Sequence, residues 1–258
     1  MHKIFLVILL FFVTAVCYGQ CFKPEYCRPF EGLKDKPLKY TESTYSLSSK
    51  ANNKKEWQST NKVSFSPLGF ILDAETSTPE YKFTTKNTDI KDGRPLRTEK
   101  ISEYLTQKMT HTFEYLVNNV NDTLDMIIVN TSLEDAGSGT DTVYLKYKDE
   151  KIISEHIIED QHFKDLEIIL DKNKNITDNK IWIDTILFMH SHHDYDKNGL
   201  PRAKTDFVTN GMNDKKTFSY EYLKFDSKGN WTECIETCLQ DNSKSITIRE
   251  IIYSKTGS

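Results

Sequence analysis

The sequence is poor in residues that favour helices and has no excess of positive charge. Alanine, the strongest helix former, is scarce, whereas aromatic residues make up 12% of the 258 residues. The formal net charge is -4, and no basic run stands out. A nonspecific nucleic-acid binder needs a basic face, and so does a protein that docks on an anionic membrane surface. We therefore expect an all-β protein that does not bind nucleic acid.

The chain also lacks the short motifs that mark common enzyme sites. It contains no G-x-S-x-G nucleophile elbow, no P-loop and no G-x-G-x-x-G fingerprint. Carboxylates are abundant, but no pair of them is singled out by its position. We therefore assign no catalytic residue and no cofactor, and we expect a noncatalytic protein.

Long hydrophobic runs are absent except at the N-terminus. There Lys3 precedes an apolar run from Ile4 to Val13, and small residues follow as far as Gly19. This order predicts a secretory signal peptide at residues 1–19. The apolar run is shorter than the roughly 20 residues that a membrane span needs. The mature chain, residues 20–258, is then expected to have no transmembrane span and to be secreted or periplasmic.

Cysteine is rare, and four cysteines would remain after cleavage: Cys21, Cys27, Cys234 and Cys238. Their even number in an exported chain predicts disulfides, and the sequence leaves all three pairings open. A zinc site is the weaker alternative, because C-x-x-C knuckles are absent. Lipid anchoring at Cys17 or Cys21 is disfavoured, because neither follows the small residue that a lipoprotein signal usually has.

Alternation of apolar and polar residues runs through most of the mature chain and predicts strands. At most one helix is expected, near residues 98–110, where Ile101, Leu105 and Met109 recur at four-residue spacing. A strand that begins near Thr110 is the alternative for the C-terminal part of this segment. The whole of residues 20–258 is interpreted as one β-rich domain. A soft boundary near residue 137 lies in the flexible loop DAGSGTD.

An irregular repeat occupies residues 140–253. Its four alternating runs end in a large apolar residue, and these residues are Tyr147, Leu170, Tyr195 and Phe225. An aspartate follows the last three, and a glycine, Gly199 or Gly229, comes shortly afterwards in the last two. Aspartate bonds the nearby backbone, and glycine supplies the positive φ that tight turns need. The repeat predicts hairpins that join into a meandering antiparallel sheet, which can curve into an open barrel.

The segments YDKNGLP and FDSKGNW, each followed by a predicted strand, resemble the YD repeats of the rearrangement-hotspot (RHS) family and its short secreted bacterial relatives. The resemblance covers residues 140–253. Leu170 replaces the aromatic residue in one unit, and two units have no glycine. The resemblance implies an extended antiparallel sheet that wraps, encloses or binds something. It implies no catalytic residue.

The stretch MHSHHDYDKNGLPR, residues 189–202, holds the densest group of potential ligands. On a strand, His190, His192 and Asp194 share one face, and His193 lies on the other. Aligning the repeats places Val143, Leu145, Leu166, Ile168 and Leu223 on the face of His193, which we therefore expect to be buried. The simplest interpretation is a solvent-exposed strand face on which the histidines need no specific function. The alternative is a zinc or copper site, because ligands at alternate strand positions can converge on one ion.

Two motif similarities of this stretch are incomplete. HSHHD is similar to the HxHxD motif of the metallo-β-lactamase superfamily, but Tyr195 replaces the next histidine and no histidine follows His193. DYDKNG matches the first half of an EF-hand calcium loop, but Thr205 stands where the loop needs a bidentate Glu. No role is carried over from the metallo-β-lactamase superfamily. A hairpin turn is the expected structure, and a turn stabilised by calcium through Asp194, Asp196 and Asn198 is kept as an alternative.

The function that these patterns favour is a noncatalytic binding or scaffold protein that is secreted or associated with the cell envelope. Its expected partner is a protein or a glycan at the envelope. Tyr220, Tyr222 and Trp231 are candidate binding residues, because aromatic rings stack on sugars and peptides; aromatic pairs also stabilise sheets. The alternatives are a metal-dependent hydrolase that uses residues 190–194, and a component of a toxin shell or export assembly.

Overall fold

The computed structural model describes residues 33–48, 54–91, 94–104, 107–116, 124–133, 137–158, 161–183, 185–209 and 214–253. The expected signal peptide, the lipid-anchoring question at Cys17 and Cys21, and the disulfide candidates Cys21 and Cys27 lie outside these residues.

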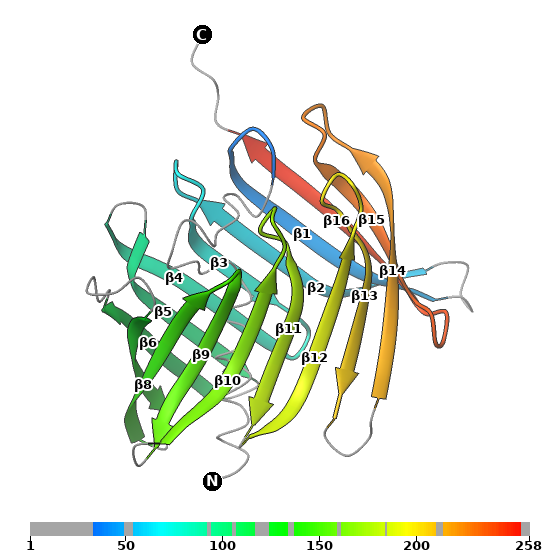
Figure 1. The fold of residues 1–258 in the computed structure, drawn as a ribbon. Coiled ribbons are helices and arrows are strands. Elements are labelled where there is room, and N and C mark those ends of the chain that lie inside the picture. Colours follow the sequence, from blue (N-terminus) through cyan, green and yellow to red (C-terminus); the bar gives the residue numbers. More distant parts are fainter. Residues whose placement is uncertain are drawn as a thin grey trace. The chain divides into compact units, whose positions relative to one another are not determined.

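The described residues form antiparallel strands joined by turns (Figure 1). The strands are β1 (Pro37–Ser48), β2 (Lys54–Phe65), β3 (Ile71–Ser77), β4 (Tyr81–Lys91), β5 (Arg94–Tyr104), β6 (Gln107–Leu116), β7 (Leu124–Leu133), β8 (Gly137–Lys148), β9 (Lys151–Ile158), β10 (Gln161–Leu170), β11 (Ile176–Ile183), β12 (Ile186–Tyr195), β13 (Pro201–Val208), β14 (Asp214–Phe225), β15 (Trp231–Cys238) and β16 (Lys244–Tyr253). This architecture confirms the expected all-β meander. Within the described ranges no helix is long and apolar enough to cross a membrane.

The best helix candidate, residues 98–110, contains no helix in its described part, which forms β5 and the start of β6. In β5, Thr98, Lys100 and Ser102 are buried, whereas Glu99 and Glu103 are exposed. This period of two is the mark of a strand. A four-residue spacing is also an even number, so it places residues on one face of a strand as well as on one face of a helix.

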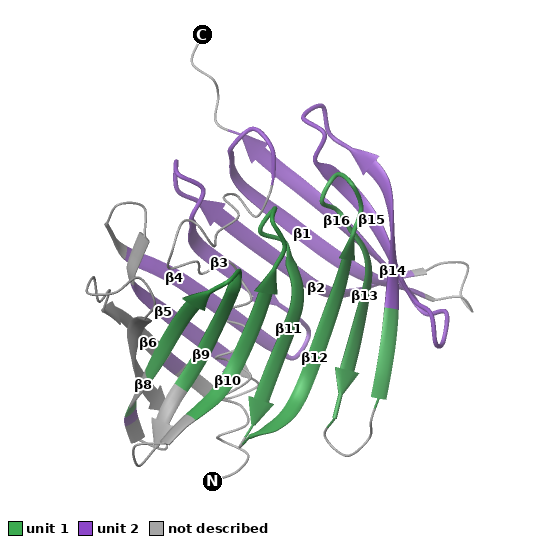
Figure 2. Ribbon diagram, in the orientation of Figure 1, with its two compact units in different colours: residues 1–28, 113–130, 140–217 green, residues 29–112, 131–139, 218–258 purple. Residues whose placement is uncertain are grey.

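The chain divides into two compact units, which are described one at a time (Figure 2). Unit 1 comprises residues 1–28, 113–130 and 140–217, and unit 2 comprises residues 29–112, 131–139 and 218–258.

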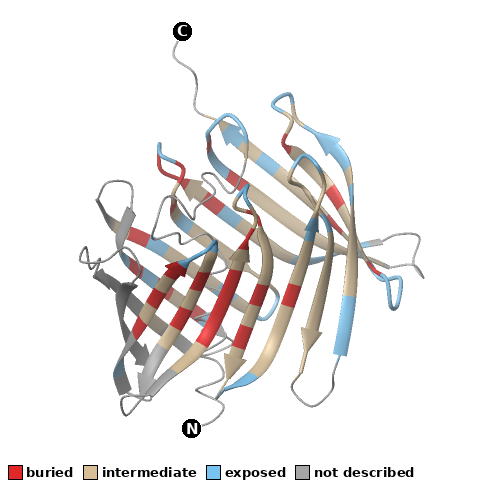
Figure 3. Ribbon diagram, viewed as in Figure 1, coloured by how far each residue is buried: buried red, intermediate tan, exposed pale blue. Residues whose placement is uncertain are grey.

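In unit 1, β8 to β13 pair in sequence order, each strand antiparallel to the next. One face of this sheet carries a buried apolar cluster. Figure 3 shows buried residues in red along β8 to β11. The buried cluster consists of Val143, Leu145, Tyr147, Ile152, Leu166, Ile168, Leu170 and Ile181. Met189 of β12 packs against this cluster. The sequence-based expectation that the face of His193 is the buried one is therefore confirmed for β12.

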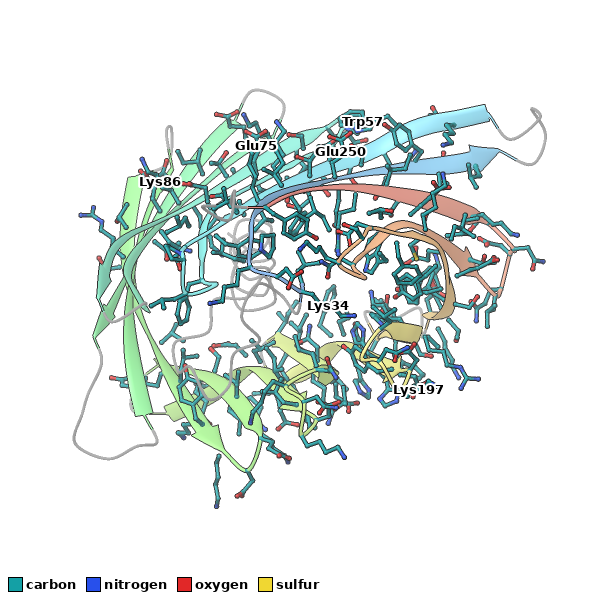
Figure 4. The ribbon with its side chains drawn as sticks, turned by 90° about the horizontal axis from the view of Figure 1, so that it is seen from above. Lys34, Trp57, Glu75, Lys86, Lys197 and Glu250 are labelled. Atoms are coloured by element: carbon teal, nitrogen blue, oxygen red, sulfur yellow. The ribbon has the colours of Figure 1, made fainter. Side chains whose placement is uncertain are left out.

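In unit 2, β1 pairs with both β2 and β16, and the strands follow the order β5, β4, β3, β2, β1, β16, β15, β14. Its main apolar cluster is smaller and consists of Tyr40, Val63, Phe65 and Ile71. Its other buried side chains include the apolar Cys234, Cys238 and Ile246 and the polar Asn87, Thr98, Lys100 and Ser102. Figure 4 shows the labelled Trp57, Glu75 and Lys86 on one side of the unit 2 strands.

One residue expected on a buried face, Leu223, is 42% exposed. The register of β14 against β15 shifts between Tyr222 and Lys224, so a β-bulge includes Leu223. A bulge inserts one residue into the alternation and turns the next side chains to the other face. The sequence-based expectation failed here because alternation was extended through an irregularity.

The hairpin turns follow the expected chemistry. In the β10–β11, β12–β13 and β14–β15 turns, the Oδ1 atoms of Asp171, Asp196 and Asp226 each accept two backbone N–H groups, from the residues two and four positions later. The residue three positions after each aspartate has a positive φ, between 65° and 79°. The β2–β3 turn has the same backbone hydrogen bonds, with Ser66 in place of aspartate. The predicted turn mechanism is thus confirmed, and one example in the first half was missed.

The β8–β9 turn differs from these four. It has only two central residues, Asp149 and Glu150, at φ 48° and 63°. Both are left-handed, as a two-residue hairpin of the favoured hand requires. The repeat unit anchored at Tyr147 therefore uses another turn type.

Candidate functional site

A group of ionisable side chains lies on the half-exposed face of β11 and β12 in unit 1. The register pairs Asp178 with His192 and Lys180 with His190. Asp178 Oδ1 lies 2.8 Å from His190 Nε2 and 3.1 Å from His192 Nδ1. One carboxylate oxygen of β11 therefore serves two imidazole rings of β12.

The shared carboxylate changes the acidity of its neighbours. Partial burial by itself would raise the pKa of Asp178, but the hydrogen bonds with His190 and His192 outweigh burial, and the pKa falls below its ordinary value. The hydrogen bond with Asp178 raises the pKa of His192, and the charge of Asp194 adds to this effect. Both shifts favour an ion pair between Asp178 and a protonated His192.

The same face continues across the neighbouring strands. Glu167 of β10 forms ion pairs with Lys164 at 3.0 Å and with Lys180 at 3.3 Å. His190 is opposite Phe207 of β13, and the two rings stack with centroids 5.7 Å apart. Lys215 lies 5.2 Å from the centroid of the Phe207 ring. Side chains of four adjacent strands and of the start of β14 thus form a continuous row. We call this surface the His–Asp face; it is formed by Glu167, Asp178, Lys180, His190, His192 and Phe207.

His193 has the opposite environment. It faces the buried side of β12, opposite Lys204 of β13, and its ring stacks on Tyr195 at 6.4 Å. Burial, together with the charge of Lys204, lowers the pKa of His193 to about 4. Two adjacent histidines therefore differ in charge over a wide pH range because alternation places them on different faces.

The predicted metal ligands are only partly brought together. His190 and His192 both turn to Asp178, whereas Asp194 is 3.5 Å from the other ring nitrogen of His192 and is 64% exposed. Among the described residues, no group of three or more His, Cys, Asp or Glu side chains is arranged to hold a metal ion. Zinc or copper binding here stays a prediction without geometric support.

Asp178 is the residue that sequence reasoning missed. It lies 12 positions before His190, in another strand, and no motif links the two. The only available signal was the hairpin between them, whose register would have placed residue 178 opposite His192. That register is itself shifted by an irregularity between Ile181 and Trp182, which alternation alone does not reveal.

Asp196, a candidate calcium ligand, stabilises the β12–β13 turn. Its Oδ1 accepts the backbone N–H groups of Asn198 at 2.8 Å and Leu200 at 2.9 Å. These bonds, that from Leu200 first, lower the pKa of the Asp196 carboxyl. The carboxylate therefore organises the turn, as the simplest interpretation of the sequence expected. Calcium binding stays untested.

The predicted aromatic binding residues lie in unit 2, where two of them pack against other side chains. The Trp231 and Tyr222 rings are 5.8 Å apart, and the guanidinium of Arg249 lies 3.7 Å from the Trp231 centroid. Arg249 also donates from Nε to Glu42 Oε1 at 2.6 Å. Tyr220 is opposite Glu236 on β15. These contacts account for Trp231 and Tyr222 as cross-strand packing, and a binding role for the three aromatics stays a prediction.

The two described cysteines cannot form a disulfide with each other while β15 is intact. Cys234 and Cys238 are both buried, and they are four residues apart in one strand. At 3.3 Å per residue their Cα atoms are about 13 Å apart, well beyond the roughly 7 Å limit for a disulfide. Burial raises the pKa of the Cys234 thiol to about 12, so it is a thiol and not a thiolate. The sequence-based option of a local loop closed by this pair is wrong.

No family model matches the chain, and no curated protein matches it. Among solved structures, a porin-like protein from Bacteroides uniformis is similar with a TM-score of 0.46 at 12% identity, over 84% of this chain and 97% of that one. A LolA superfamily protein from Nitrosomonas europaea has a TM-score of 0.33 at 7% identity, over 87% and 89% of the two chains. A DUF1329 family protein from Desulfovibrio piger has a TM-score of 0.27 at 9% identity, over 89% and 90%.

Proposed function

We propose that this chain is a noncatalytic, secreted or envelope-associated protein that binds a partner through the His–Asp face of unit 1. The partner is a protein or a glycan of the cell envelope. The observation that carries the proposal is the sharing of Asp178 by His190 and His192 on a half-exposed sheet face.

The geometry of this face suits recognition. One nitrogen of each ring is hydrogen-bonded to Asp178, and this shared contact fixes the orientation of both rings. His192 remains 44% exposed and Lys180 29% exposed, so a partner can reach charged donors held in fixed positions. Fixed donors lose little freedom on binding, which favours affinity.

The proposed location rests on the N-terminal sequence. The basic residue, short apolar run and small residues that end at Gly19 predict export. Peptide mass spectrometry of the protein recovered from a bacterial periplasmic extract should find Gln20 as the new N-terminus. Recovery of an unprocessed chain in the cytoplasm would refute this location.

We also keep the relation to YD repeats as a proposal. It is supported by the equivalent turns at Asp171, Asp196 and Asp226, each of which begins after a large apolar residue and accepts the same two backbone N–H groups. An extended sheet built from such hairpins offers a broad surface to a partner.

A capture experiment with two matched surface variants tests the binding proposal. The first variant, Asp178→Ala with His190→Ala and His192→Ala, removes the shared-carboxylate group. The control, Lys62→Ala with Glu75→Ala and Lys82→Ala, removes an equally ion-paired group from unit 2, where Glu75 lies 2.9 Å from both lysines. Each protein is immobilised, exposed to solubilised envelope from its own host, and the bound material is quantified by mass spectrometry.

We expect wild type and the control to retain the same partner, and the His–Asp variant to lose at least tenfold of it while still unfolding cooperatively. Equal retention by all three proteins would refute binding through this face. The rival hydrolase is tested on the same wild-type protein, purified without a histidine tag. Stoichiometric zinc that is lost in a His192→Ala variant would favour the hydrolase.

A further inference from the structure

The four residues before the first strand of unit 2 are held by an unusual number of contacts. Leu33 packs against the Tyr40 cluster of unit 2. The backbone N–H of Lys34 donates to Asn230 Oδ1 at 2.8 Å, and Asn230 Nδ2 donates back to the Lys34 carbonyl at 3.2 Å. Asp35 forms an ion pair with Lys228 at 3.1 Å. We call residues 33–36 the strap.

Asn230 joins three segments that are far apart in the sequence. It follows the β14–β15 turn, is only 5% exposed, and its backbone N–H is bonded to Asp226 Oδ1. Its side-chain amide also donates to the Tyr253 hydroxyl at 2.7 Å, and that hydroxyl donates to the Asp226 carboxylate. The amide therefore connects the start of β1, the β14–β15 turn and the end of β16.

The backbone of the strap is strained. Asp35 and Lys36 both have positive φ, 60° and 48°, although neither is glycine. Such conformations are costly and persist only where surrounding contacts enforce them. The turn lies beside the strap: a Cβ added at Gly229, which has φ 79°, would lie 3.1 Å from the flexible end of the Lys34 side chain.

A second asparagine shows what the strap adds. Asn175 has the same place in the β10–β11 turn of unit 1: it is 3% exposed and its backbone N–H bonds to Asp171 Oδ1. Its side-chain amide, however, donates to Asp171 of the same turn at 2.8 Å. In the equivalent position, Asn230 directs its amide to a segment 196 residues away.

We propose that the strap couples the local stability of the start of β1 to that of the β14–β15 turn and the end of β16. Asn230 is the positioning residue that holds the strap in place. While the Asn230 contacts are made, the start of β1, the β14–β15 turn and the end of β16 unfold locally as one unit. When these contacts are lost, local unfolding of the turn and of the end of β16 costs less free energy. The strap directly follows the segment that is expected to begin the mature chain. Binding or pulling on that segment is therefore expected to change the local stability of the β14–β15 turn. This coupling goes beyond the proposed function and does not depend on it.

Hydrogen exchange of the full chain, followed by mass spectrometry at constant pH, tests the coupling. Asn230→Ala removes all three side-chain contacts. We expect exchange to become about tenfold faster in peptides that cover residues 33–40, 226–235 and 249–253, because one hydrogen bond contributes roughly a factor of ten. The matched variant Asn175→Ala, in unit 1, should leave exchange at residues 33–40 and 249–253 unchanged. Faster exchange in Asn230→Ala that is confined to residues 226–231 would overturn the proposal.

A second pair of variants acts from the other side and leaves Asn230 intact. Lys36→Ile places a β-branched residue at positive φ, which should release the strap. Lys39→Ile makes the same change at an exposed position of β1, where an extended backbone accepts it. We expect Lys36→Ile, and not Lys39→Ile, to accelerate exchange at residues 226–235. If Asn230→Ala does not fold, this pair decides: a change confined to residues 33–40 would refute the coupling.

Discussion

The two units use the same strand-and-turn chemistry but stabilise their buried faces differently. In unit 1, a cluster of aliphatic residues spreads over four strands, and Leu145 at its centre is completely buried. In unit 2, the main apolar cluster consists of only Tyr40, Val63, Phe65 and Ile71, and other buried apolar side chains, such as Cys234 and Ile246, are not part of it. Buried polar groups occur in both units; in unit 2, Asn87 donates to the Ile71 carbonyl at 2.7 Å, and Thr98 donates to Asn87. The same type of hairpin turn therefore supports one large apolar cluster in unit 1 and a smaller one in unit 2.

The physical consequence is a difference in how each unit tolerates change. Apolar packing is nondirectional, so its loss costs free energy in proportion to the volume removed. Buried polar groups are directional, so removing one partner leaves the other unsatisfied. The large cluster of unit 1 should therefore be the region most sensitive to lost volume, and buried polar pairs, such as Glu42 and Arg249 in unit 2, should be sensitive to the loss of one partner.

The largest expected effect is in the apolar core of unit 1. Leu145→Ala should lower the free energy of unfolding by about 3 kcal/mol, since the side chain is fully buried in a strand with little room to collapse. Urea denaturation followed by circular dichroism measures this loss. Leu239→Ala, at a position that is 54% exposed, is the control and should change the free energy by less than about 0.5 kcal/mol. A similar loss of free energy for both variants would contradict the claim that burial of Leu145 in the apolar cluster stabilises unit 1.

The next effect concerns a buried polar pair of unit 2. Glu42→Ala removes the partner of Arg249, whose side chain is only 13% exposed and lies between the Trp231 and Tyr40 rings. We expect a loss of about 2 kcal/mol, because the guanidinium stays buried without its counter-charge. The double variant Glu42→Ala with Arg249→Met should recover a large part of that loss. Additive losses would show that the pair is not coupled.

The smallest effect distinguishes the two adjacent histidines of unit 1 by pH. Because the pKa of His193 is lowered to about 4, its neutral form stabilises the fold above pH 6.5, and this stability is lost as the pH falls from 6.5 towards 4. Between pH 7.5 and 5 the wild type should lose about 1 kcal/mol through this residue, after allowance for its partial exposure. His193→Phe should reduce that loss in urea titrations.

His192 has the opposite sign. Its raised pKa gives stability that is complete below pH 6.5 and is lost as the pH rises through the value in the folded protein. His192→Asn should therefore weaken the protein at pH 5.5 and leave it unchanged at pH 8. The Asp178 carboxyl, with its lowered pKa, keeps this pair intact until the pH falls below the ordinary carboxyl range. The same pH dependence in both histidine variants would contradict the assignment of opposite faces.

Much of the local structure could be predicted because it depends on neighbours in the sequence. The turns at Asp171, Asp196 and Asp226 form within five residues, through bonds from each aspartate to its own backbone. The alternation around His190 and His192 correctly separated them from His193. Predictions from local patterns failed where the structure depends on pairing between two strands. Examples are the helix candidate at residues 98–110, which forms strands, and the bulge at Leu223.

The sequence by itself determined the all-β class, the positions of the Asp-bearing turns and the two faces of β12, because each of these follows from interactions a few residues apart. Only the tertiary structure decided that Asp178 serves two histidines, that Arg249 lies between Trp231 and Tyr40, and that Asn230 holds the strap. These contacts join residues that are 12 to 209 positions apart. Strand register brings such residues together, and register depends on bulges and on pairing partners that no short stretch of sequence contains.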